Sequence, residues 1–176
     1  MPTDEAVIAW NDAGIQDLNT QTWSSDNQFV RVLYYRIFYL ISLTNDFMRQ
    51  STEDVMDANG VPIEDRKEIL QYRAEARYLR ALGYWHALDF FRNVPLITTI
   101  SGDFPEQSDA AGIFSFIASE LNEIEPLMAD ARSNEYGRAD RAALWMLRAK
   151  LNLNAEVYIG EDRYSEVIAD CNNIIA

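Results

Sequence analysis

Hydrophobic residues recur every three or four positions along most of the chain, which is the spacing of the buried face of an α-helix. The longest such stretch runs from about Ile63 to Phe91 and carries two apolar lines. These lines are Ile69, Tyr72, Ala76, Leu79, Gly83, His86 and Phe90, and Leu70, Ala74, Arg77, Ala81, Tyr84, Leu88 and Phe91. A helix with two apolar lines lies between neighbours, so we place it at the centre of the fold.

Five further stretches predict helices. They cover residues 4 to about 20, the residues after Asp26 to about 50, those from Ser108 or Asp109 to about Pro126, residues 140 to about 158, and 164–176. Asp26 is expected to cap the second of these helices. The segments 57–62 and 94–109 contain turn-forming residues and are expected to be irregular, with a short extended piece at Leu96–Ile100.

Two of these helices carry more specific expectations. In the helix up to residue 50, an aromatic band of Tyr34, Tyr35, Phe38 and Tyr39 is typical of core packing. The inner side of the last helix is expected to consist of Val167, Ile168, Cys171, Ile174 and Ile175. The sequence ends while this helix is still apolar, which we interpret as truncation of a longer protein.

The predicted architecture is all-α, with six helices arranged as antiparallel pairs of the tetratricopeptide-repeat type. Helix, turn and helix follow one another around Gly160, as they do in such repeats, although the repeat consensus is only partly present. No low-complexity stretch or flexible linker interrupts the chain. Residues 1–176 are therefore interpreted as one domain.

Composition excludes several classes of function. The net charge is −13, from 28 acidic and 15 basic residues, which disfavours binding to nucleic acid or to anionic lipid. A single cysteine, Cys171, excludes an internal disulfide and a multi-cysteine metal site. The sequence shows no signal peptide, lipidation cysteine or transmembrane run. It also contains no phosphate-binding glycine loop, so no cofactor is predicted.

Catalytic residues are hard to find in this sequence. His86 is the only histidine and has no serine or cysteine partner nearby, so we interpret it as a core residue. Two acidic pairs, Glu120 with Glu123 and Glu53 with Asp54, are the arrangement that a helical glycosidase would use. Acidic pairs are frequent in so acidic a chain, and we predict that the protein is not an enzyme. Glu75, Arg77 and Arg80 are expected to form structural ion pairs.

Two sequence motifs are distinctive. The first is Glu-Ala-Arg-Tyr-Leu-Arg-Ala at 75–81, followed by Tyr84 and by Phe-Arg-Asn-Val-Pro-Leu at 91–96. The second is Leu-Asn-Ala-Glu-Val-Tyr-Ile-Gly at 153–160, followed by Arg163 and Tyr164. Together they resemble the SusD/RagB family of glycan-binding lipoproteins, although many members have Gly-Asp where this chain has Arg92-Asn93. The resemblance implies a SusD-like α-α superhelix, of which this chain is the N-terminal helical part.

The resemblance also implies a function. Similar proteins bind oligosaccharides or other nutrients on the extracellular face of the outer membrane of Bacteroidetes. They work with a SusC-like TonB-dependent transporter, and a lipid anchor absent from this chain holds them at the membrane. A tetratricopeptide-type scaffold for protein interactions is the alternative, and a helical glycosidase is a further one. The glycan itself and the oligomeric state are not specified by the sequence.

Neutral sugars are bound by flat aromatic faces together with amide or carboxylate groups. In similar proteins, a Trp and an Asn before the second helix take part in binding, and Trp23 and Asn27 are the nearest counterparts here. Trp10, with Asn11, is a weaker alternative on the predicted first helix. Trp23 stands in a polar stretch, where a tryptophan either anchors the loop or contacts a ligand, and the anchor is the commoner role.

Overall fold

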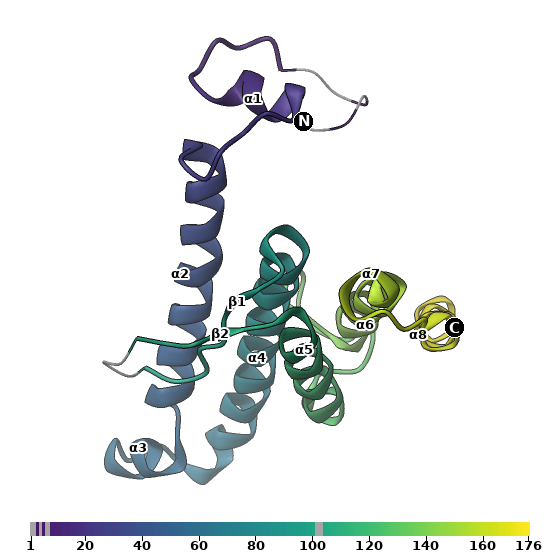
Figure 1. Ribbon diagram of the computed structural model, residues 1–176. Coiled ribbons are helices and arrows are strands. Elements are labelled where there is room, and N and C mark those ends of the chain that lie inside the picture. Colours follow the sequence, from purple (N-terminus) through teal and green to yellow (C-terminus); the bar gives the residue numbers. More distant parts are fainter. Residues whose placement is uncertain (1–2, 4, 6–7, 101–103) are drawn as a thin grey trace. The chain divides into compact units, whose positions relative to one another are not determined.

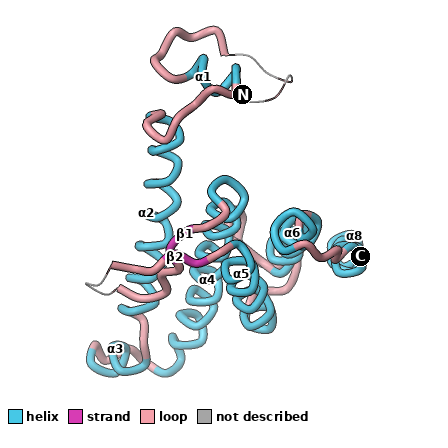
Figure 2. The backbone as a smooth tube through the Cα atoms, in the orientation of Figure 1, coloured by secondary structure: helices cyan, strands magenta, loops and turns pink. Residues whose placement is uncertain are grey.

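The computed structural model describes residues 3, 5, 8–100 and 104–176 and is dominated by helices (Figures 1 and 2). The prediction of an all-α fold is confirmed. The elements in chain order are α1 (Ile15–Thr20), α2 (Gln28–Gln50), α3 (Glu53–Ala58), α4 (Ile63–Phe91), β1 (Val94–Pro95), β2 (Gln107–Ser108), α5 (Ala110–Ile124), the 3₁₀ helix η1 (Glu125–Leu127), α6 (Arg141–Leu153), α7 (Ala155–Ile159) and α8 (Tyr164–Ile175).

The chain forms two compact units, Met1–Tyr39 and Leu40–Ala176. Helix α2 crosses from one to the other, and each unit is described by itself. The interpretation of residues 1–176 as one domain stays a prediction. No helix in the described part of the chain combines the length and the apolar character that crossing a membrane requires.

In the first unit, the predicted helix at 4–20 is wrong over residues 8–14, and its residues 4, 6 and 7 lie outside the described residues. Helix α1 begins only at Ile15, because Gly14 has a φ of 87°, in the left-handed region that L-residues rarely adopt. A Cβ atom at this position would also lie 2.8 Å from Nδ2 of Asn27. The backbone conformation of Gly14 therefore fixes the start of the helix.

The second unit is built around α4, whose predicted bounds, Ile63 to Phe91, are confirmed. Its neighbour α5 runs antiparallel to it (Figure 1) and buries four isoleucine and leucine residues that recur at helical spacing, namely Ile113, Ile117, Leu121 and Ile124. On α4, the line that contains Ala74, Ala81, Tyr84 and Leu88 is buried at these four positions, whereas Leu70 at its start is exposed. The other line is only partly buried, since Leu79 and Phe90 are exposed.

Close packing of α4 depends on small residues. A Cβ atom at Gly83 would lie 3.2 Å from Cγ1 of Ile41, so glycine allows α4 to approach the part of α2 that belongs to this unit. Ala81 and Ala87 are completely buried beside it. These small residues therefore leave room for the neighbouring helix to approach α4 closely.

Four predictions about the remaining elements need correction. The segment predicted as a loop at 57–62 contains the end of α3. The extended piece is not Leu96–Ile100 but Val94–Pro95, which pairs antiparallel with Gln107–Ser108. The fifth helix is broken at Asn154, whose φ of −101° and ψ of 12° are not helical. In α8, Ile168 and Ile175 are exposed instead of internal, because Asp170 is the residue that turns inward.

Buried charges tie α4 to its neighbours. Arg77 and Arg80 both pair with Glu120 of α5, at 2.6 and 2.7 Å, and Arg80 also donates to Oδ1 of Asn45 at 2.8 Å. Glu75 pairs with Arg138 at 2.6 Å and accepts a hydrogen bond from Asn134. An unpaired charge in such positions is too costly to persist, so these pairs have a structural role, as the sequence predicted.

Acid is expected to destabilise the second unit through Glu75. Burial raises the pKa of this carboxyl, but hydrogen bonds from Arg138, Asn134 and Gln71 outweigh burial and lower the pKa below its ordinary 4.5. The unfolded chain then binds the proton more tightly than the folded one. The stabilisation is therefore complete above about pH 4.5 and is lost as the pH falls through the lower folded pKa.

This prediction is tested by urea unfolding at a series of pH values between about 6 and about 3. In Glu75→Gln the loss of stability on acidification should be smaller than in the unchanged chain, because one of the contributing carboxyls is gone. Equal losses in the two proteins would contradict the assignment to Glu75.

Candidate functional site

Trp10 is the most exposed tryptophan side chain among the candidates, at 69%. The sequence placed Trp10 on the predicted first helix, and this prediction is wrong. The residue lies in the non-helical stretch before α1. Its neighbours Asn11 and Asp12 are also exposed. A flat apolar indole beside exposed amide and carboxylate groups is the combination that binds the C–H face and the hydroxyls of a sugar.

Trp23 lies in the turn between α1 and α2 and is 43% exposed. The side chain is thus neither fully buried under the loop nor fully presented to solvent. Gln21, two residues earlier, adopts a φ of 58° and ends α1. Trp10 and Trp23 belong to the same unit, and we call them together the tryptophan pair.

Asn27 is buried, with only 6% of it exposed, and both polar atoms of its side chain form hydrogen bonds. Oδ1 accepts hydrogen bonds from the backbone N–H of Phe29 at 3.0 Å and of Val30 at 3.4 Å, as a helix cap does. Nδ2 donates to the carbonyl of Gly14 at 2.8 Å. Asn27 therefore caps α2, and the prediction of Asp26 as the cap is wrong.

The first turns of α2 present a surface that the sequence reasoning did not identify. Val32, Tyr35, Arg36 and Tyr39 line a shallow hollow of about 350 Å³. The expectation that the aromatic band is core is wrong for Tyr35 and Tyr39, which are exposed, whereas Tyr34 and Phe38 are partly buried with ring centroids 4.6 Å apart. The sequence did contain a signal for this surface, because residues spaced as 32, 35, 36 and 39 are lie on one face of a helix.

The acidic pairs do not have the properties of glycosidase carboxyls. Glu120 is held by Arg77 and Arg80. A hydrogen bond from Arg77 lowers the pKa of Glu123, whereas the general acid of a glycosidase needs a raised pKa. Glu53 and Asp54 lie exposed in the first turn of α3. Within the described residues, no group of three or more His, Cys, Asp or Glu side chains is placed to hold a metal ion.

His86 and Cys171 are both partly buried. Burial lowers the pKa of His86, and its ring stacks on Phe90 at an interplanar angle of 10°. A neutral imidazole packed between aromatic rings fits a structural histidine, which is how the sequence was interpreted.

Comparison with known proteins identifies relatives. The chain is 39% identical over 176 residues to the starch-binding protein SusD of Bacteroides thetaiotaomicron, covering 99% of this chain and 30% of that protein. A crystal structure of a SusD superfamily protein from Parabacteroides distasonis superposes with a TM-score of 0.76 at 21% identity, over 94% of this chain and 35% of that one. Surface glycan-binding protein A from Bacteroides fluxus gives a TM-score of 0.70 at 26% identity, over 93% and 33%.

No family model matches the chain. The match to SusD extends over 99% of this chain, but the chain spans only 30% of the length of SusD. The solved relatives share its helical, tetratricopeptide-like fold. The similarity in sequence and in fold shows that the chain belongs to the SusD/RagB family.

Proposed function

We propose that the chain is the helical part of a SusD-like nutrient-binding protein and binds oligosaccharide without catalysing a reaction. The observation that carries this proposal is the exposure of Trp10 beside Asn11 and Asp12. The names of the relatives support the ligand class, since one is a starch-binding protein and another a surface glycan-binding protein. Neutral sugars require neither a metal ion nor a positive surface, which agrees with a net charge of −13.

Within the tryptophan pair, Trp10 is proposed as the main stacking platform. More of its side chain is accessible than of Trp23, and stacking needs an open ring face. Asn27, named from the sequence together with Trp23, uses its amide to cap α2 and to bind the carbonyl of Gly14. Its contribution to binding is therefore proposed to be indirect, through the position of the loop that carries Trp23.

Replacing Trp10 with Ala is expected to weaken binding of maltooligosaccharides by about 1–3 kcal/mol, which is the cost of losing an aromatic stacking partner. The melting temperature should be nearly unchanged, because the side chain is mostly exposed. Isothermal titration calorimetry and a thermal melt measure the two effects. Trp23→Ala is expected to weaken binding less.

Tyr136→Ala is the matched control, since Tyr136 is a fully exposed aromatic residue in the other unit. Its removal should leave both affinity and stability unchanged. The proposed site is contradicted if Trp10→Ala binds sugar as tightly as the unchanged chain does.

We further propose that the complete protein acts with a SusC-like TonB-dependent transporter on the extracellular face of the outer membrane, held there by a lipid anchor outside these 176 residues. Family membership supports this partnership. Co-purification of the full-length protein with the transporter from detergent-solubilised outer membranes tests it. Absence of the transporter from the purified complex, under conditions that retain the lipidated protein, speaks against the partnership.

A protein-interaction scaffold is the second candidate, and one observation favours it. The hollow on α2 combines Tyr35, Tyr39 and Arg36 with Val32, and tyrosine and arginine are enriched in protein interfaces. The same titrations with sugar separate this candidate from the first. A chain that binds no glycan but whose Tyr35→Ala variant loses a protein partner would favour the scaffold.

A further inference from the structure

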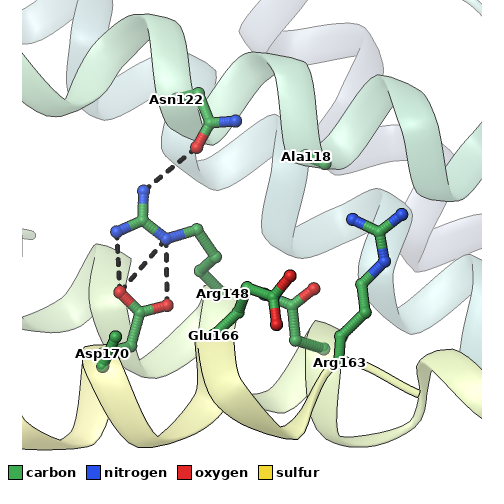
Figure 3. Close-up of a pocket in the computed structure, with 8 residues that line it drawn as sticks. Ala118, Asn122, Arg148, Arg163, Glu166 and Asp170 are labelled. Atoms are coloured by element: carbon green, nitrogen blue, oxygen red, sulfur yellow. Dashed lines mark hydrogen bonds and ion pairs between the residues drawn. The ribbon is translucent and has the colours of Figure 1, made fainter.

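A second polar pocket lies between α5, α6 and α8, in the unit that does not contain the tryptophan pair (Figure 3). Its volume is about 260 Å³. It is lined by small apolar residues and by side chains that donate and accept hydrogen bonds, namely Ala118, Asn122, Arg148, Asn152, Arg163, Glu166, Ala169 and Asp170.

Arg148 forms a rigid wall of this pocket. Its guanidinium donates to Asp170 at 2.6 and 2.9 Å, to Glu125 at 2.6 Å and to Oδ1 of Asn122 at 3.1 Å. Figure 3 shows the guanidinium held between Asp170 and Asn122. With its donors satisfied within the protein, Arg148 positions its neighbours and has little capacity left for a ligand.

Two other lining groups have unused hydrogen-bonding capacity. Asn152 is 93% buried (7% exposed), and its side-chain amide makes no hydrogen bond to any described residue. Nε of Arg163 is buried and likewise lacks a partner in the described part of the chain. The Arg163 guanidinium lies over the ring of Phe114 at 5.3 Å and reaches toward α5 (Figure 3). Buried polar groups are nearly always paired, so the unpaired Nε of Arg163 indicates a missing hydrogen-bonding partner, and the Asn152 amide, which lines the same pocket, can supply a second hydrogen bond.

The charges of the lining define the class of this partner. Arg148 and Arg163 are opposed by Asp170 and Glu166, so the four charged side chains that line the pocket balance. A simple anion would be attracted by the arginines but repelled by the carboxylates beside them, and a simple cation would meet the reverse. A neutral molecule whose hydroxyl groups both donate and accept suits the Asn152 amide, the Arg163 guanidinium and the Glu166 carboxylate together. Ala118 and Ala169 supply a small apolar surface.

We propose that this pocket is a second binding site, which takes a single neutral sugar unit between α5, α6 and α8. The volume is just below the roughly 300–1,000 Å³ that is usual for small-molecule sites, so it suits one ring and not a buried chain. The choice of sugar as ligand rests on the proposed function, whereas the site itself is independent of the tryptophan pair.

The test is a nuclear magnetic resonance titration of the ¹⁵N-labelled chain with glucose, galactose and mannose. The Nε–H signal of Arg163 and the side-chain NH₂ signals of Asn152 should shift with a saturable dependence on the concentration of at least one of these sugars. In Asn152→Ala the dissociation constant should rise by at least about tenfold, equivalent to about 1.4 kcal/mol. Ala118→Leu, which narrows the pocket from α5 and keeps both polar groups, should abolish the saturable shift.

Asn173→Ala removes an exposed amide on α8, is the control and should retain the affinity. Trp10→Ala should retain it too, while binding maltooligosaccharides more weakly at the tryptophan pair. The proposals for the pocket and for the tryptophan pair can therefore be contradicted separately. The proposal is overturned if no sugar moves the Arg163 and Asn152 signals, if Ala118→Leu responds as the unchanged chain does, or if sulfate moves the signals and the sugars do not.

Discussion

Replacing Glu120 with Ala is expected to lower the free energy of unfolding of the unit Leu40–Ala176 by about 3–5 kcal/mol, because it leaves the buried Arg80 without a carboxylate partner and Arg77 with Glu123 alone. The side chain of Glu120 is 9% exposed and accepts from both Arg77 and Arg80. Arg80 is itself 8% exposed and, once Glu120 is removed, retains hydrogen bonds to Asn45 and to the carbonyl of Thr98. Neither of these acceptors carries a charge.

Glu123→Ala provides the matched control. Glu123 accepts from the same Arg77, at 2.5 Å, but its side chain is 60% exposed. An exposed ion pair is screened by solvent, so its removal should have little effect on the free energy of unfolding. Urea unfolding of the two variants measures the difference. Equal destabilisation by the two substitutions would contradict the structural role assigned to Glu120.

The second large effect is expected at Asp170. This carboxylate is 2% exposed and binds the guanidinium of Arg148, and the hydrogen bond to Asp170 is the main cause that raises the pKa of Arg148 above its ordinary value. Asp170→Ala leaves a partly buried guanidinium short of its closest partner. We expect a loss of about 3–5 kcal/mol in the free energy of unfolding.

Ile168, two residues earlier on α8, is 62% exposed, and Ile168→Ala should change stability by no more than about 0.5 kcal/mol. Asp170→Ala is therefore expected to lower the free energy of unfolding more than Ile168→Ala does, although isoleucine is the larger, apolar residue on the same helix. Urea unfolding of both variants tests this order. The account of α8 fails if Ile168→Ala is the more destabilising substitution.

Helical periodicity predicted α4 and α5 well because their signals are local. The four apolar residues of α5 recur with helical spacing, and Asp109 caps the helix by accepting from the N–H of Gly112 at 2.8 Å. Such patterns and caps can be recognised from neighbouring residues alone. The bounds and the buried face of α5 followed from them.

The errors arose where a distant contact decides the outcome. The start of α1 depends on the amide of Asn27, thirteen residues beyond Gly14. The inward face of α8 depends on Arg148 of α6, which makes Asp170 the buried residue, whereas apolar spacing favoured Ile168. Neither pairing can be derived from the local pattern.

Only part of the candidate site could be predicted from the sequence, because it too depends on contacts between distant residues. Aromatic residues near the start of the chain could be named, but exposure separates Trp10 from Trp23, and exposure is a property of the folded unit. The amide of Asn152 shows the same limit, because its lack of a partner is defined by the residues of α5 and α8 that surround the pocket. Sequence supplied the chemical groups, and packing decided which of them remain available.

The central claim is most directly tested by the indole Nε1–H signals of the four tryptophans during titration of the unchanged chain with a maltooligosaccharide. Trp85 and Trp145 serve as internal controls, since Nε1 of Trp85 is buried and Nε1 of Trp145 donates to Glu125. The account predicts that the Trp10 signal shifts most, with a smaller shift for Trp23 and none for Trp85 and Trp145. Saturable sugar binding that leaves the Trp10 signal unmoved, or no binding at all, would contradict it.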